Sequence, residues 1–184
     1  MIGERTMRIH VLVAFTAAVG FLAGAGAQAQ QPSPTPGAQP AASAPAPRPE
    51  YGLPINNEQA KAAAAAAIEE AKKNNWRMVI AIVGTDGELV YLERMDGTQN
   101  ASSALAQSKA RTAALYRQAS KAFADQFAAG NIGFMTFPDH ARPIASEGGI
   151  PIVANGKLIG AIGASGGSGA QDGIAANAGA AAVK

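Results

Sequence analysis

Residues 147–172 constrain the possible fold more than any other part of the chain, and they read EGGIPIVANGKLIGAIGASGGSGAQD. Two runs rich in β-branched residues, 150–154 and 157–162, flank the dipeptide Asn155-Gly156. Both central residues of a type I′ turn need a positive φ angle, which Asn and Gly tolerate best. The segment therefore predicts a β-hairpin with its turn at Asn155-Gly156.

The second strand of this hairpin contains Gly160 and Gly163. Glycine weakens the interior of a strand, so these positions predict close packing of another segment against the backbone. The strand leads into a loop of small residues, 165–169, and then into an Ala-rich helix expected over about 171–183 with Asp172 as its cap. Backbone N–H groups of such a loop can bind an anion, but tight packing explains its glycines equally well.

The chain of 184 residues divides into three parts. Residues 1–29 have the pattern of a secretory signal peptide, with Arg5 and Arg8 before an uncharged apolar run and A-x-A cleavage sites after it; an uncleaved anchor is the alternative. Residues 30–50, rich in Pro and Ala, predict a disordered linker. Residues 51–184 then form one domain, and we expect a periplasmic or secreted protein with no stable membrane span after cleavage.

Composition narrows the classes of partner. The chain has 15 basic and 13 acidic residues without a basic cluster, so nucleic acid is not expected as a partner. It has no Cys, which excludes disulfides and thiolate ligands. Beyond the predicted signal peptide, His140 is the only histidine.

The order of elements predicts an α+β fold. A helix over 60–71, capped by Asn56 with Gln59 in a capping box, precedes two strands at 78–83 and 89–92. Further helices are expected at 104–116, with Asn100, Ser102 and Ser103 as possible caps, and at 120–128, followed by an aromatic-rich segment with a short strand near Phe134. With the hairpin and the last helix the order is αββααββα, which favours an antiparallel sheet flanked by helices.

Several motifs occur in one order along the chain: Arg94 with Asp96, Lys109-Ala110-Arg111-Thr112-Ala113, Gly148-Gly149-Ile150-Pro151, Asn155-Gly156, the glycine-rich run 160–166, and Asp172. The series resembles the GlcG/HbpS family, which includes the C-terminal domains of PduO-type proteins, over residues 56–183. The resemblance implies a profilin-like antiparallel sheet and assembly into homo-oligomers. It also implies export and the binding of haem or, in some relatives, of a corrinoid.

Two residues are candidate ligands of a haem iron. His140 lies among aromatic residues and carries an imidazole, the usual protein ligand of haem, although a loop histidine is more often structural. The resemblance makes Thr112 the other candidate, since some HbpS-like members are thought to use a threonine near the iron. The alternative for Thr112 is a hydrogen bond to the helix carbonyl of Ser108.

The rest of the predicted site combines cations and small residues. Lys109, Arg111 and Arg94 can neutralise the propionates of haem, although solvated surface charge is the usual role of such residues. Lys109 is preferred because it shares a helix face with Thr112. Gly148, Gly149, Ser165 and Gly166 would form the opposite wall. We therefore expect a cleft between residues 109–112 and 148–169, within one subunit or at a subunit interface.

These observations favour an exported small-molecule-binding protein, most simply one that binds haem or a related tetrapyrrole. One alternative is an enzyme that acts on a small molecule or degrades haem in the same cleft, and another is a ligand-free oligomeric accessory domain. A Ser165–His140–Asp172 triad is not favoured because the serine lacks the G-x-S-x-G elbow of hydrolases. No catalytic residue is assigned.

Overall fold

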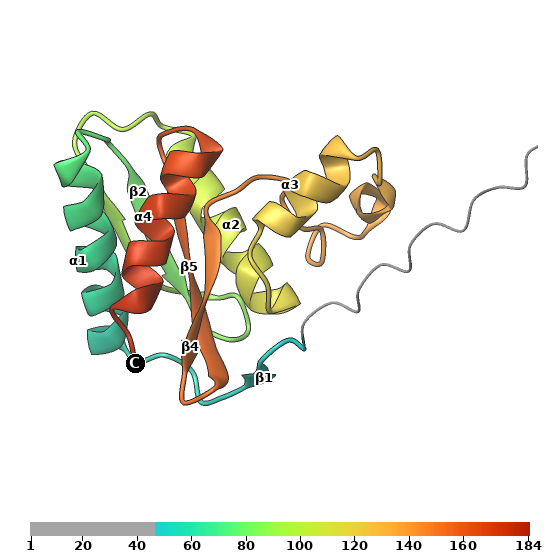
Figure 1. The fold of residues 1–184 in the computed structure, drawn as a ribbon, viewed down its shortest axis with the longest axis horizontal. Coiled ribbons are helices and arrows are strands. Elements are labelled where there is room, and N and C mark those ends of the chain that lie inside the picture. Colours follow the sequence, from blue (N-terminus) through green and yellow to red (C-terminus); the bar gives the residue numbers. More distant parts are fainter. Residues whose placement is uncertain (1–46) are drawn as a thin grey trace, which may run out of the picture. The chain divides into compact units, whose positions relative to one another are not determined.

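The computed structural model describes residues 47–184, and these belong to one folded unit (Figure 1). The predicted signal peptide and the predicted linker as far as residue 46 lie outside the described residues. The elements follow in the order β1 (Glu50–Tyr51), α1 (Asn57–Lys73), β2 (Val79–Val83), β3 (Leu89–Arg94), α2 (Ser102–Tyr116), α3 (Lys121–Ala128), the 3-10 helix η1 (Gly133–Thr136), β4 (Gly149–Ala154), β5 (Lys157–Ser165) and α4 (Gly169–Ala181). Apart from β1 and η1, this is the predicted order αββααββα.

The sheet is centred on β5. Strands β4 and β2 pair with β5 in antiparallel fashion, and β3 pairs with β2 in the same way. The expectation of a purely antiparallel sheet needs one correction, because β1 runs parallel to β5 and makes the sheet mixed. The α+β class and the layer of helices on each face are as predicted.

Alternate residues of β2 point to opposite faces of the sheet, as the pleat requires. Ile80 and Ile82 belong to the main core, which α1 and α4 cover mainly with Ala side chains. Val79, Ala81 and Val83 face α2 on the other side. The sheet is thus buried on both faces at β2 and β5, so these strands read as continuous apolar runs in the sequence.

The structure confirms two local predictions, one for a turn and one for a helix cap. Asn155 and Gly156 have φ angles of 51° and 75°, as the predicted type I′ turn requires. The Asn56 side chain accepts the N–H of Gln59 at 2.9 Å, and the Gln59 side chain accepts the N–H of Asn56 at 3.2 Å, which completes the predicted capping box.

Two predicted caps are wrong. The last helix begins at Gly169 with Ser168 as its cap, so Asp172 lies inside the first turn, where it is buried. Helix α2 has no side-chain cap at its start. The Asn100 carboxamide oxygen accepts a hydrogen bond from the Arg94 guanidinium instead.

Residues 120–146, which we call the α3–η1 lobe, leave the layered body between α2 and β4 (Figure 1). The strand predicted near Phe134 is wrong, since these residues form η1. Three aromatic rings anchor the lobe: Tyr116 of α2 packs edge-on against Phe123, and Phe123 packs edge-on against Phe134. At the base, the Ser120 hydroxyl donates to the Ser146 carbonyl at 2.6 Å and accepts the N–H of Gly149 at 2.9 Å.

Among residues 47–184, no helix combines the length and the apolar character needed to cross a membrane.

Candidate functional site

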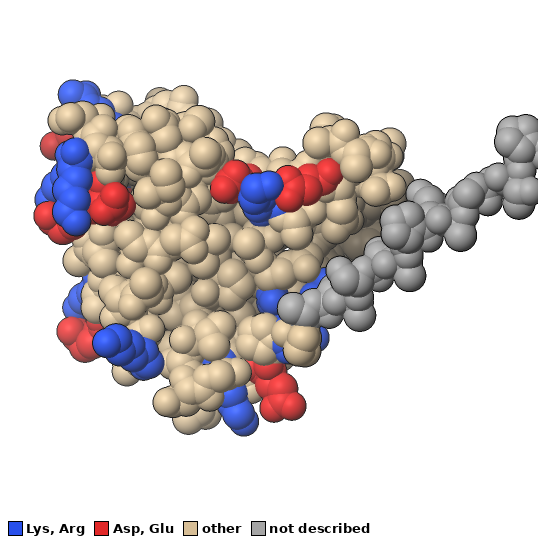
Figure 2. Space-filling model, in the orientation of Figure 1, with Lys and Arg blue, Asp and Glu red and all other residues tan. Residues whose placement is uncertain are grey.

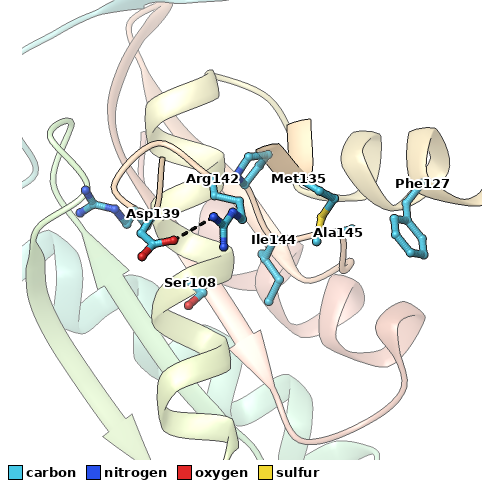
Figure 3. Close-up of a pocket in the computed structure, with 9 residues that line it drawn as sticks. Ser108, Phe127, Met135, Asp139, Arg142, Ile144 and Ala145 are labelled. Carbon is cyan, nitrogen blue, oxygen red and sulfur yellow. Dashed lines mark ion pairs between the residues drawn. The ribbon is translucent and has the colours of Figure 1, made fainter. Parts of the chain in front are cut away.

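An open pocket lies between α2 and the α3–η1 lobe, with a volume of about 480 Å³. Helix α2 contributes Ser108 and Arg111, which lie one helical turn apart and therefore on one face. The lobe contributes the other side chains, which are Phe127, Met135, Asp139, Arg142, Pro143, Ile144 and Ala145 (Figure 3). The pocket therefore joins two segments that the aromatic stack holds together.

One side of the pocket is apolar. Phe127 and Met135 remain 50% and 44% exposed, although large apolar side chains of a folded domain are usually buried. In Figure 3, Ile144 lies next to Arg142, whereas Met135 and then Phe127 lie progressively further from the Asp139–Arg142 pair. Two of the exposed large apolar side chains of the described residues thus line one hollow, and an apolar wall of this kind is typical of a ligand site.

The other side carries two cations in ion pairs. Arg142 binds Asp139 at 2.9 Å, and Arg111 binds Glu88 of the β2–β3 turn at 3.2 Å. The carboxylates are strongly exposed, so each pair contributes little to stability and its arginine can exchange partners. Both guanidinium groups are therefore available to an anionic ligand.

His140 lines a neighbouring cavity of about 460 Å³ together with Arg111, Leu115, Tyr116 and Ala141. Its backbone carbonyl accepts a hydrogen bond from Arg111 at 3.2 Å. Arg111 thus lines both cavities. This arrangement brings His140 next to the pocket but not into the set of residues that line it.

Lys109 and Asp172 form a buried ion pair with a distance of 2.6 Å between Lys109 Nζ and Asp172 Oδ2. The Lys109 side chain is only 3% exposed. The other Asp172 oxygen accepts the N–H of Gly167 at 2.9 Å. Burial raises the pKa of Asp172 above its ordinary value, while the Lys109 ammonium and the loop N–H groups oppose that shift. Lys109 is therefore neutralised inside the protein rather than by a ligand.

Thr112 is also buried, with 3% exposure, and its Oγ1 accepts the N–H of Ile144 at 2.9 Å. The hydroxyl thereby fixes the end of the α3–η1 lobe to α2. This contact differs from the hydrogen bond to Ser108 named as the alternative. Ile144 itself lines the open pocket, so Thr112 supports the pocket wall from behind.

The small residues of the predicted cleft are packed against protein atoms. A Cβ at Gly149 would overlap the carbonyl of Lys109, and one at Gly166 would overlap the carbonyl of Arg77. A Cβ at Gly148 would come within 2.8 Å of the Asp172 side chain. Ser165 is 2% exposed, with its hydroxyl 3.4 Å from that of Ser102. Segments 109–112 and 148–169 thus meet directly.

Arg94 is held away from these segments by the loop that precedes α2. Its guanidinium donates to the Thr98 carbonyl at 2.6 Å and to the Asn100 side chain at 2.8 Å. The structure therefore brings Lys109, Thr112 and the glycines into one packed contact, and it leaves Arg94 and His140 outside it.

Comparison with known proteins identifies the family. Residues 55–181 match the family model described as "Haem degrading protein HbpS-like". The chain belongs to the HbpS-like family. This confirms the resemblance inferred from the order of the sequence motifs.

HbpS-like relatives cover the same domain. Protein GlcG of Escherichia coli K12 is 41% identical over 111 residues, which are 60% of this chain and 81% of GlcG. The crystal structure of HbpS superimposes with a TM-score of 0.65 at 29% identity, covering 72% of this chain and 92% of that chain. The crystal structure of the PduOC:Heme complex superimposes with a TM-score of 0.66 at 28% identity, covering 72% of this chain and 96% of that chain.

Of the residues that line the open pocket of this HbpS-like chain, sequence reasoning named only Arg111, as a candidate partner of the propionates. Ser108 and Arg111 each precede one of the predicted site residues, Lys109 and Thr112, by one position in α2, so they lie on an adjacent face of the helix. The usable signal was the segment 131–143, which is rich in apolar residues but follows no strand or helix period. Apolar residues that no regular element buries predict an exposed apolar surface.

Proposed function

We propose that this HbpS-like protein is an exported protein that binds haem in the pocket between α2 and the α3–η1 lobe. The observation that carries the proposal is the pairing of an exposed apolar wall with two arginines in one hollow. Haem presents the matching chemistry, since it is a flat apolar ring with two carboxylates at one edge. The solved PduOC complex contains heme, which supports this ligand class for the fold.

The residues present fit such a ligand. A volume of about 480 Å³ lies in the usual range of small-molecule pockets, roughly 300–1,000 Å³. Phe127 and Met135 would pack on the ring, and the planar guanidinium groups of Arg111 and Arg142 suit carboxylates. Bound haem would supply a redox-active iron, and the protein would bind it, orient it and restrict the access of water.

The proposed haem pocket lies on a different side of α2 from the cleft that was expected from the sequence. His140 stays a candidate iron ligand because its cavity adjoins the pocket. Thr112 is less suited, since its oxygen accepts the N–H of Ile144 and is buried. Lys109 has its charge neutralised by Asp172.

The test is a haem titration of the protein produced from Gln30, followed by the Soret absorbance. We expect a saturable shift in the wild type. Arg111→Gln and Arg142→Gln should each weaken binding by about tenfold, because a hydrogen bond to a charged group contributes about 1.5–3 kcal/mol. Arg94→Gln is the matched control and should bind as the wild type does. No saturable shift, or full affinity in the double arginine variant, would reject the pocket assignment.

Export is the second part of the proposal and rests on the signal-peptide pattern of residues 1–29. Mass spectrometry of protein recovered from the periplasm or medium should give a mature chain that begins close to Ala27–Gln30. Recovery of the intact chain in the cytoplasm would contradict export.

Haem degradation is the second candidate function, and the name of the family that the chain matches, "Haem degrading protein HbpS-like", favours it. The same complex should then lose its Soret band in air when a reductant such as ascorbate is added, and a linear tetrapyrrole should form. A stable Soret band under these conditions would exclude haem degradation and leave haem binding as the function. A parallel titration with a corrinoid tests the other tetrapyrrole class.

A further inference from the structure

Met135 differs in its surroundings from the other methionines of the described chain. Met78 is fully buried, and Met95 packs against the main core. Met135, in η1, leaves 44% of its surface exposed and lines the open pocket. An apolar side chain in this position gains little for the stability of the fold, so its sulfur is free to act on a ligand.

The backbone around Met135 is well fixed. Its N–H donates to the Ile132 carbonyl at 2.9 Å, and the Thr136 hydroxyl donates to the Gly133 carbonyl at 2.8 Å. The preceding residue, Phe134, is buried against Phe123 with the ring centroids 5.5 Å apart. Because Phe134 points into the lobe, η1 presents Met135 to the pocket, where Figure 3 shows its side chain on the side of Ile144 and Ala145.

The residues that line the pocket offer few donors for a haem iron. The Asp139 carboxylate is a hard oxygen donor that is 93% exposed, and the Ser108 hydroxyl is a poor ligand. The Met135 thioether is a soft donor of the kind that binds haem iron in electron-transfer proteins. His140 carries a stronger donor, but it lines the adjoining cavity beyond Arg111.

We propose that the Met135 sulfur is a protein ligand of the haem iron, an inference that rests on the proposed haem-binding function. Met135 then holds the iron from the lobe, while Arg111 holds a propionate from α2. The two contacts together fasten the α3–η1 lobe to the body of the protein. A thioether ligand also raises the reduction potential of the iron.

Met135→Leu tests the assignment, since leucine keeps the apolar volume and removes the sulfur. Met95→Leu is the matched control outside the pocket. The readouts are the Soret titration, the near-infrared charge-transfer band of a ferric iron–thioether bond, and the reduction potential. We expect the wild type and Met95→Leu to show the band. Met135→Leu should still bind haem, without the band and with a lower potential.

The possible outcomes distinguish failure of the Met135 assignment from failure of haem binding itself. A wild-type complex without the thioether band, or a Met135→Leu complex that keeps it, overturns the proposal while haem binding stands. Loss of the native ligand spectrum in His140→Ala but not in Met135→Leu overturns it in favour of the imidazole. Absence of a saturable Soret shift in the wild type overturns the proposed function itself, and with it the role of Met135.

Discussion

At the scale of single residues, glycines set the distance between α2 and the sheet. A Cβ at Gly163 of β5 would overlap the carbonyl of Ala106, and one at Gly149 of β4 would overlap that of Lys109. Neither backbone atom can move without shifting the helix. The glycines in these strands predicted that another segment packs closely against the sheet. They could not show that this segment is α2, because a glycine carries no information about what packs on it.

Gly163→Ala should therefore destabilise the protein by at least about 1–3 kcal/mol, the usual cost of overpacking a core. Gly133→Ala is the matched control, since a Cβ at Gly133 has no neighbour within 4 Å. Urea unfolding followed by circular dichroism measures both. Equal midpoints for the two variants would show that α2 does not lie this close to β5.

The Lys109–Asp172 pair gives a second prediction for single residues. Lys109→Met leaves the Asp172 carboxylate buried without its cation, which should cost about 3–5 kcal/mol. Adding Asp172→Asn to that variant should restore part of the loss, because the uncompensated charge is gone. Thermal unfolding of the two variants measures the difference. A double variant as unstable as the single one would contradict the charge explanation.

Sequence reasoning placed Lys109 and Thr112 on one helix face, which is correct, but it could not show that this face is buried. Helix α2 consists mainly of Ala and polar residues, so no apolar stripe marks the side that packs on the sheet. The partner that makes burial of Lys109 possible, Asp172, lies 63 residues further along the chain. Only the tertiary structure brings the two together.

At the scale of elements, the α3–η1 lobe depends on few contacts. Phe123 is the only buried residue of α3, and its ring lies between those of Tyr116 and Phe134. The sequence analysis predicted this helix at residues 120–128. The short strand near Phe134 was not realised, because residues 133–136 pack on α3 as a turn of 3-10 helix and have no strand partner.

Phe123→Ala should loosen the lobe while the sheet and its helices stay folded. We expect faster amide exchange over residues 121–136, with little change in β2 and β5, since local opening follows local contacts. Phe127→Ala is the matched control: Phe127 is half exposed, so exchange in the lobe should stay unchanged while haem affinity falls. Uniformly faster exchange throughout the chain in Phe123→Ala would show that the lobe is part of the main core.

At the scale of the whole molecule, the homo-oligomer expected from the family resemblance stays a prediction. Helix α4 offers a surface suited to it, because its one charged residue, Asp172, is buried, while Ile174 is 50% exposed. Figure 2 shows a broad area without charged side chains over most of this helix. Uncharged exposed faces of this kind often mark contacts between proteins.

Sedimentation velocity of the protein produced from Gln30 should therefore find a species larger than a single chain. Ile174→Glu should lower the sedimentation coefficient by placing a charge in the contact. Lys157→Glu, an exposed substitution outside α4, should not. A monomeric wild type would contradict the predicted homo-oligomer. An Ile174→Glu variant with an unchanged sedimentation coefficient would show that the subunits do not meet at α4.

The central claim is the location of the ligand, and paramagnetic NMR of the ferric haem complex tests it most directly. The iron broadens the signals of nuclei close to it. We predict selective loss of the signals of Ser108, Met135 and Ile144, while those of Gly148, Gly166 and Asp172 remain. Signal loss centred on Gly148, Gly166 and Asp172 would instead show that haem binds in the cleft expected from the sequence. Uniform or absent broadening would contradict a specific haem site in this pocket.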